Sequence, residues 1–229
     1  MAYKNYYNMK NASGTSLTDS VGGNTGTLGG SDLPDINSNG YLEFTSAHNA
    51  TPGNWQRVNV ATESDFRYSN TSAFSYAILF RSSKTDGLLH SLISTGNWED
   101  AGKIYMYLDP SEQLSIFFQC GSKSKVYIGS SSICDGKWHL VVAVYSSDTL
   151  AVYVDGGPVT LTQNQAYGSA NFYPASNCKT VLGALWSRVN ANYVYDGISD
   201  IAYFINYNHA LSAAEAKNLY IHLKELVGF

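Results

Sequence analysis

Two carboxylates close together can cleave a glycosidic bond, one acting as the acid and the other as the base or nucleophile. The sequence can be searched for such pairs by their spacing. A retaining glycosidase needs its two carboxyl groups about 5 to 5.5 Å apart, and a strand supplies that spacing through a motif such as Glu-x-Asp-x-x-Glu. None of the six glutamates begins that motif: Glu43, Glu63, Glu99, Glu112, Glu215 and Glu225. A nucleophile elbow, a His-Glu-x-x-His helix and a phosphate loop are also missing. We therefore predict that the chain is not an enzyme and has no catalytic residues.

Aromatic side chains in polar segments indicate a different chemistry, the binding of a sugar or of another protein. A flat ring can stack on a sugar ring while neighbouring Asn, Asp and Arg side chains bond the hydroxyl groups. Three tryptophan-containing segments have this character, and they predict the ligand-binding residues Trp55, Trp98, Trp186, Arg188 and Asn192. The alternative for each tryptophan is a lid over the edge of the core or a place in a subunit interface.

Many short strands are expected to position these segments. Apolar and polar residues alternate over residues 41–44, and a longer apolar run covers residues 74–80. Further strands are expected at residues 88–94, 103–108, 113–119, 125–128, 138–145, 151–155, 179–183 and 197–207. Residues 15–40 are dense in Gly, Ser, Asn, Thr and Asp and are expected to form a long, turn-rich entry to the fold. The regular spacing favours an antiparallel sandwich, and 229 residues fit one domain over residues 1–229.

One helix is expected at the C-terminus. Ser212 and Glu215 have the spacing of a capping box, in which the serine accepts a free backbone N–H and the glutamate reaches back. Leu219, Leu223 and Leu226 then recur at helical spacing, so this helix is expected to pack on the sandwich.

The most specific motif runs through residues 135–145 as D-G-K-W-H-L-V-V-A-V-Y, and L-A-V-Y-V-D-G follows at residues 150–156. This pair of strands resembles the laminin-G-like and pentraxin-like members of the concanavalin A-like superfamily. Residues 181–183, 195–201 and 208–215 are similar to the closing segments of that family. The resemblance covers most of the chain and is weakest over residues 45–75. It implies an all-β fold, an antiparallel two-sheet jelly-roll sandwich with a short C-terminal α-helix.

The resemblance also implies a structural calcium ion. In laminin-G-like jelly rolls an aspartate of the N-terminal loop and one of the closing strand often share such an ion, which points here to Asp19, Asn24 and Asp200. The alternative is that Asp19 caps a turn and Asp200 bonds locally. Within the central motif, Trp138 is expected to fill the sandwich interior, and His139 to bond nearby backbone.

Composition excludes several classes of partner. A formal net charge of -4 and a pI near 5.7 leave no extended cationic surface for phosphates, so nucleic-acid binding is not expected. No stretch reaches the roughly 18 apolar residues of a membrane span, and the N-terminus lacks the apolar segment of a secretory signal. Cys120, Cys134 and Cys178 are expected to be free thiols, with a Cys120–Cys134 bridge as the alternative.

These observations favour a non-catalytic, lectin-like or adhesion module that binds a glycan or a partner surface. The alternative is a structural virion protein, such as a phage capsid decoration or tail-fibre domain, because charges are few and Ser, Asn, Gly and Tyr are abundant. A polysaccharide-active enzyme on the same fold is the third hypothesis. We expect an extracellular or virion-surface location, and assembly as a homo-oligomer or on a virion is compatible with both leading hypotheses.

Overall fold

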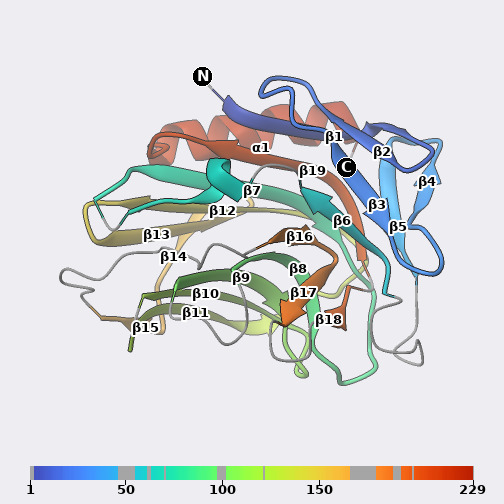
Figure 1. The fold of residues 1–229 in the computed structure, drawn as a ribbon. Helices are drawn as coiled ribbons and strands as arrows, with labels where there is room; N and C mark the ends of the chain where they lie inside the picture. The colour runs from blue at the N-terminus through green and yellow to red at the C-terminus, as the bar shows by residue number, and fades with distance from the viewer. Residues whose placement is uncertain are drawn as a thin grey trace.

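In the part of the chain that the computed structural model describes, two layers of antiparallel strands pack together and one α-helix lies on the outside (Figure 1). The structure describes residues 3–45, 55–60, 63–69, 71–96, 102–120, 122–165, 179–187, 192–197 and 199–228. Among these residues, no helix is long and apolar enough to cross a membrane. The expected all-β sandwich with a C-terminal helix is confirmed.

The first layer, here called the helix-side sheet, has the strand order β4, β5, β19, β7, β12, β13, β14. Strand β1 continues beside β19 where β5 ends. The strands of this sheet are β1 (Tyr3–Ser13), β4 (Asp35–Asn37), β5 (Tyr41–Phe44), β7 (Phe74–Arg81), β12 (Trp138–Ser146), β13 (Thr149–Val154), β14 (Gly157–Val159) and β19 (Ser199–Tyr207).

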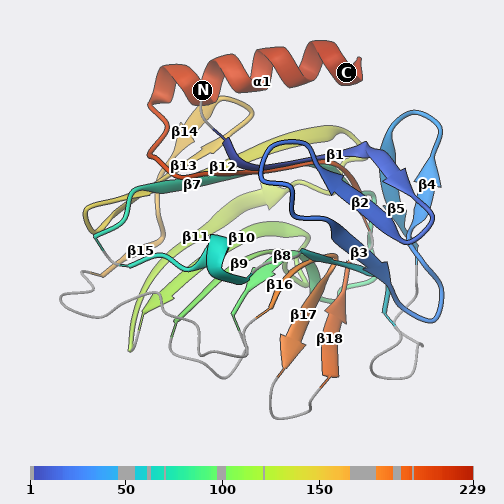
Figure 2. The same cartoon turned by 45° about the horizontal axis from the view of Figure 1, so that its top comes forward.

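The opposite sheet has the strand order β3, β6, β16, β8, β9, β10, β11, β15. Its strands are β3 (Gly26–Gly29), β6 (Arg57–Val60), β8 (His90–Thr95), β9 (Gly102–Leu108), β10 (Gln113–Cys120), β11 (Lys123–Ser132), β15 (Gln163–Asn164) and β16 (Thr180–Leu182). Strand β2 (Ser16–Asp19) pairs with both β1 and β3 and so joins the two sheets. A separate hairpin of β17 (Ala184–Ser187) and β18 (Asn192–Asp196) projects from this side (Figure 2).

The central strands of the helix-side sheet are buried on both faces. Along β7, Tyr76 and Ile78 face the opposite sheet, while Ala77 and Leu79 face the helix. Because side chains alternate along a strand, one continuous apolar run can serve two cores.

Helix α1 (Ala213–Val227) covers the outer face of the helix-side sheet (Figure 2). The expected capping box is confirmed, since the Glu215 N–H donates to Ser212 Oγ at 3.2 Å and the Ser212 N–H donates to Glu215 Oε2 at 2.8 Å. Leu219 and Leu223 are buried as expected, but Leu226 is 55% exposed. Leu226 lies in the last turn of α1, at the end of the helix, whereas the two buried leucines lie nearer its middle.

The glycine-rich entry differs from the expectation. Residues 15–40 contain β2, β3 and β4 as well as turns, and β1 precedes them as an 11-residue strand that the sequence reading did not identify. Most strands expected after residue 40 are confirmed within a few residues. The turn at Asp155 and Gly156 has φ angles of 52° and 76°, as a two-residue hairpin turn with both residues at positive φ requires.

Trp138 is buried on the other side of its sheet from the side expected. Its indole belongs to the core under α1 and makes an edge contact with Tyr41, with ring centroids 5.3 Å apart. Because β12 is apolar on both faces, alternation alone does not say which face meets the sandwich interior.

His139 bonds two carboxylates rather than backbone. Its Nδ1 lies 2.8 Å from Asp155 Oδ2, and its Nε2 lies 3.0 Å from Asp135 Oδ1. Burial lowers the pKa of His139, but the hydrogen bonds and charges of Asp155 and Asp135 outweigh burial and raise it above the ordinary value.

A pH dependence of stability follows from this geometry. Because the native-state pKa of His139 is raised, its contribution to stability is present in full below the unfolded-state pKa of about 6.5 and is lost as pH rises through the native-state pKa. We expect the stability difference between wild type and His139→Gln to be largest below about pH 6.5 and to shrink as the pH rises above that value, as measured by urea unfolding. The exposed His222 of α1 supplies the control His222→Gln. A difference that stays constant with pH would contradict this prediction.

Cys134 is a buried free thiol, and burial raises its pKa to about 11. It therefore does not form the alternative bridge to Cys120. The side chain of Cys120 and the whole of Cys178 lie outside the described residues.

Candidate functional site

The candidate site is built where the opposite sheet gives way to the β17–β18 hairpin. Strand β16 lies between β6 and β8, and Gly183 then turns the chain into β17 with a φ of 75°. The Gly183 N–H donates to the carbonyl of Leu92 in β8 at 3.1 Å, which fixes the turn to the sheet. The hairpin is thereby held against the end of the sandwich.

Two predicted tryptophans pack on one small core at this hairpin. Trp55, which precedes β6, and Trp186 of β17 both pack on a small core of Val181, Ala184 and Tyr193. The rings of Trp186 and Tyr193 meet edge to face, with centroids 4.9 Å apart and planes at 67°. Both tryptophans remain partly exposed. We call Trp55, Trp186 and Tyr193, together with Arg57 and Lys179, the rim aromatic cluster.

Two cations lie against these rings. Lys179 Nζ lies 3.8 Å from the centroid of Trp186, and Arg57 Cζ lies 3.8 Å from the centroid of Tyr193. The phenol of Tyr193 donates to Asn59 Oδ1 at 2.6 Å and accepts from Lys179 Nζ at 3.3 Å. These contacts hold the cations and the rings in one arrangement.

The arrangement offers apolar ring surface next to hydrogen-bonding groups. Trp55 Nε1 is buried and has no hydrogen-bond partner among the residues that the structure describes. Lys179 adds a positive charge at the margin of the ring surface. Such a combination suits a ligand that has both C–H faces and polar groups.

The side chains of the other three predicted ligand-binding residues lie outside the described part of the chain. Trp98 and Arg188 lie outside the described residues. The backbone of Asn192 pairs with Ser187 at the start of β18, but its side chain is not described. Tyr193 comes directly after Asn192, so the sequence could have identified it as a further aromatic residue of the same polar segment. Its contact with Arg57 depends on how β6, β16 and the hairpin are placed.

Asp19 and Asn24, predicted calcium ligands, lie in a buried polar network at β1 and β2. Asp19 Oδ1 accepts the Tyr6 N–H at 2.8 Å and the Val21 N–H at 3.0 Å, and Oδ2 accepts from Asn5 Nδ2 at 2.9 Å. Burial raises the pKa of Asp19, but these donors outweigh burial and lower it. Because N–H groups point at the carboxylate, its oxygens face donors rather than a cation.

Asn24 is joined to the same network through Asp65 of the 3-10 helix η1 (Glu63–Phe66), with Asn24 Nδ2 lying 2.5 Å from Asp65 Oδ2. Glu63 and Asp65 have the Glu-x-Asp spacing of the first half of the retaining-glycosidase motif. They lie on a helical turn, so this spacing does not put them on one face of a strand.

Asp200, the third predicted calcium ligand, pairs with Arg81 on the neighbouring strand instead. Arg81 Nη2 lies 2.5 Å and Nε 2.8 Å from Asp200 Oδ2. Burial and the nearby charge of Glu43 raise the pKa of Asp200, and together they outweigh the hydrogen bond and charge of Arg81, which lower it. In the described part of the chain, no three His, Cys, Asp or Glu side chains are placed to hold a metal ion together. The predicted ligand set does not fit one site, and calcium binding stays a prediction.

A family model described as the concanavalin A-like lectin/glucanases superfamily, of the laminin G type, matches residues 52–217. No curated protein matches the chain significantly.

Solved structures share the fold at low sequence identity. The Botulinum neurotoxin serotype G binding domain has a TM-score of 0.69 and 17% identity, and the match covers 97% of this chain and 51% of that one. The binding domain of Paraclostridial Mosquitocidal Protein 1 has a TM-score of 0.71 and 13% identity, over 96% and 52% of the two chains. Trypanosoma rangeli sialidase in complex with sialic acid has a TM-score of 0.65 and 16% identity, over 97% and 33%.

This chain therefore spans about half the length of the two binding domains and about a third of the sialidase. At these identities the structures show a common fold. The family model covers well over half of the chain. The chain belongs to the concanavalin A-like lectin/glucanase superfamily.

Proposed function

We propose that the chain is a non-catalytic, lectin-like module that binds a glycan through the rim aromatic cluster. The observation that carries the proposal is the packing of Trp55 and Trp186, two partly exposed indoles from distant segments, on one small core beside Tyr193.

The named functions of similar structures support a binding role. One Botulinum neurotoxin binding domain is in complex with rat synaptotagmin II, and the sialidase is in complex with sialic acid. Sandwiches of this shape therefore form part of proteins that hold a protein ligand in one case and a sugar in another. A sugar suits the cluster because its C–H face can pack on an indole while its hydroxyl groups bond to Lys179 at the margin of the rings.

The test is glycan binding by Trp186→Ala. Truncating a tryptophan at the centre of a binding site costs about 2 kcal/mol or more, so we expect affinity to fall about thirtyfold or more. A glycan array with wild type identifies the ligand, and titration calorimetry measures the two affinities.

Tyr220→Ala is the matched control, since Tyr220 is a partly buried aromatic residue of α1 on the outer face of the other sheet. It should leave glycan affinity unchanged. Uniformly blank arrays, or equal affinities in wild type and Trp186→Ala, would overturn the proposal. The melting temperature of each variant shows whether the fold is intact.

A glycoside-cleaving function is the second candidate, because Asp200 of β19 faces Glu43 of β5 directly across the ladder. Cross-strand neighbours place their Cβ atoms about 4.5 to 5.5 Å apart, which is close to the spacing of a retaining pair. Both carboxylates already have partners, however. Arg81 forms an ion pair with Asp200, and Asn37 Nδ2 donates a hydrogen bond to Glu43. Release of reducing sugar by wild type that is lost in Asp200→Asn would favour catalysis over our proposal.

A further inference from the structure

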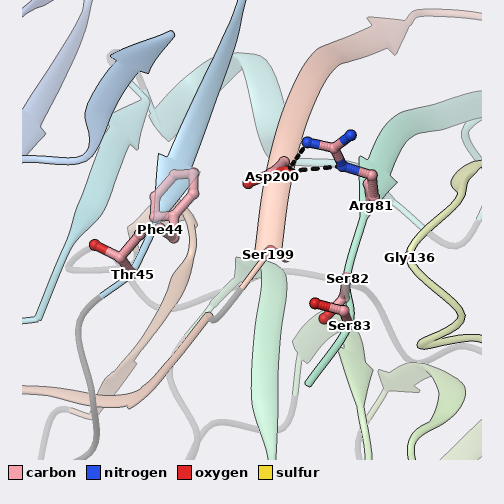
Figure 3. Close-up of a pocket in the computed structure, with 8 residues that line it drawn as sticks. All are labelled: Phe44, Thr45, Arg81, Ser82, Ser83, Gly136, Ser199 and Asp200. Carbon is pink, nitrogen blue, oxygen red and sulfur yellow. Dashed lines mark hydrogen bonds and ion pairs between the residues drawn. The ribbon is translucent and has the colours of Figure 1, made fainter. Parts of the chain in front are cut away.

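A pocket opens on the surface at the ion pair between Arg81 and Asp200 (Figure 3). It has a volume of about 290 Å³, at the lower end of the range for small-molecule sites. Its walls come from the end of β5, the end of β7 and the start of β19. Four of the residues that line it carry hydroxyl groups: Thr45, Ser82, Ser83 and Ser199.

The hydroxyl of Ser199 is the unexplained group of this pocket. The residue is 4% exposed, and its Oγ has no hydrogen-bond partner among the residues that the structure describes. A buried hydroxyl group without a partner is unfavourable, because it has given up its bonds to water. A ligand hydroxyl placed in the pocket would supply the missing bond.

The charges of the pocket restrict the ligand. Arg81 binds Asp200 through Nε and Nη2, and its guanidinium also lies 5.0 Å from the centroid of the Trp138 ring. The two opposite charges balance, so the pocket offers donors and acceptors without a net charge. An uncharged ligand with several hydroxyl groups can use both, because each hydroxyl donates and accepts.

The pocket and the rim aromatic cluster lie on either side of the same short stretch of chain. The ring of Phe44, which lines the pocket, packs against Gly183 at the start of the hairpin. The Thr45 N–H donates to Gln56 Oε1 at 2.6 Å, and Gln56 lies between Trp55 and Arg57 in the chain. The two places are therefore linked through Phe44 and Gln56.

We propose that this pocket binds a single uncharged sugar residue, with Ser199, Asp200 and Arg81 bonding its hydroxyl groups. This inference rests on the proposed function in that the pocket is a second subsite for the same glycan. It names a different set of residues and a different ligand chemistry, hydroxyl recognition rather than ring stacking.

Ser199→Ala separates a binding role from a structural one. Removing a hydroxyl group that lacks a partner should leave the melting temperature unchanged or raise it. The same change should weaken binding of a free sugar about tenfold, the effect of losing one hydrogen bond of about 1.4 kcal/mol. The probes are glucose, galactose, mannose and N-acetylglucosamine, and saturation-transfer NMR on the full chain measures the binding of each. The exposed Ser83 supplies a second variant, Ser83→Val, which is expected to weaken binding of the same sugar.

Trp186→Ala, which lies outside the pocket, should leave the saturation-transfer signal of the free sugar unchanged. Sugar binding that survives both serine variants, a clear fall in melting temperature in Ser199→Ala, or preference for N-acetylneuraminic acid over every neutral sugar would each overturn the assignment. If glycan arrays respond to Trp186→Ala but no free sugar binds, the pocket fails and the proposed function stands. If a free sugar binds in the pocket while arrays stay blank, the proposed function fails and the pocket stands.

Discussion

Replacing Gly183 with alanine is expected to lower the free energy of unfolding by about 2 to 5 kcal/mol. Gly183 has a φ of 75°, where a residue with a Cβ is strained by about 1 to 2 kcal/mol. The added Cβ would also lie 2.3 Å from Phe44 Cε1, well inside contact distance. Phe44 is 1% exposed and packed in the core, so its ring must shift to make room for the Cβ, and overpacking of this kind costs about 1 to 3 kcal/mol more.

Gly87→Ala is the matched control for the backbone strain. Gly87 has a φ of 70°, and nothing lies within 4 Å of the position its Cβ would take. It should therefore lose about 1 to 2 kcal/mol, the strain alone. Urea unfolding of wild type and both variants gives the three free energies. Equal losses in the two variants would show that Phe44 does not restrict Gly183.

The Gly183 variant also connects stability to binding. Gly183 directs the hairpin that carries Trp186, and the ring it touches lines the sugar pocket. A shift of Phe44 would disturb both places at once. Among variants that remain folded, glycan affinity should therefore fall in Gly183→Ala and stay unchanged in Gly87→Ala.

The central strands could be predicted because runs of consecutive apolar residues indicate buried strands. Strands β7 and β12 are such runs, and the Asp155–Gly156 turn and the Ser212 cap each depend on one or two residues with local geometry. The face of each strand could not be predicted in the same way. Trp138 and Val141 are both buried, yet they belong to different cores.

Strand β1 was missed because a polar residue occupies one of its inward positions. Its alternate residues Asn5, Tyr7 and Met9 are all fully buried, but Asn5 interrupts the apolar alternation that marks a strand. The position of Asn5 becomes intelligible only with its partners, which come from β2, η1 and β19.

The candidate site shows the same division between local and long-range information. Trp55 and Trp186 could be selected as aromatic residues in polar segments, but their packing on one core depends on the register of β6 with β16, in which Asn59 faces Val181. Asp200 was selected as a metal ligand, whereas the β19–β7 register places it opposite Arg81. Pairing between distant strands is not contained in residue spacing along one segment.

Asn206→Ala is expected to destabilise the protein by about 3 to 5 kcal/mol, because it leaves several buried groups without partners. Asn206 is fully buried in β19, and its Oδ1 accepts from the Tyr68 hydroxyl at 2.6 Å. Its Nδ2 donates to Asn5 Oδ1 at 2.8 Å and to the Asp65 carbonyl at 3.2 Å. Each buried group left unsatisfied costs about 1 to 3 kcal/mol, and the losses fall on β1, η1 and β19 together.

Asn11→Ala is the control, since Asn11 is an exposed residue of β1 whose amide donates to Ser20 Oγ at 3.1 Å. A surface change of this kind should stay within about 0.5 kcal/mol of wild type. Urea unfolding measures both variants, and hydrogen exchange of the β1 amides tests whether the loss is transmitted to that strand, as the bond from Asn206 to Asn5 requires. A loss below about 1 kcal/mol in Asn206→Ala, or β1 amides as protected as in wild type, would show that β1 is held by its ladder with β19 and does not depend on the buried amides.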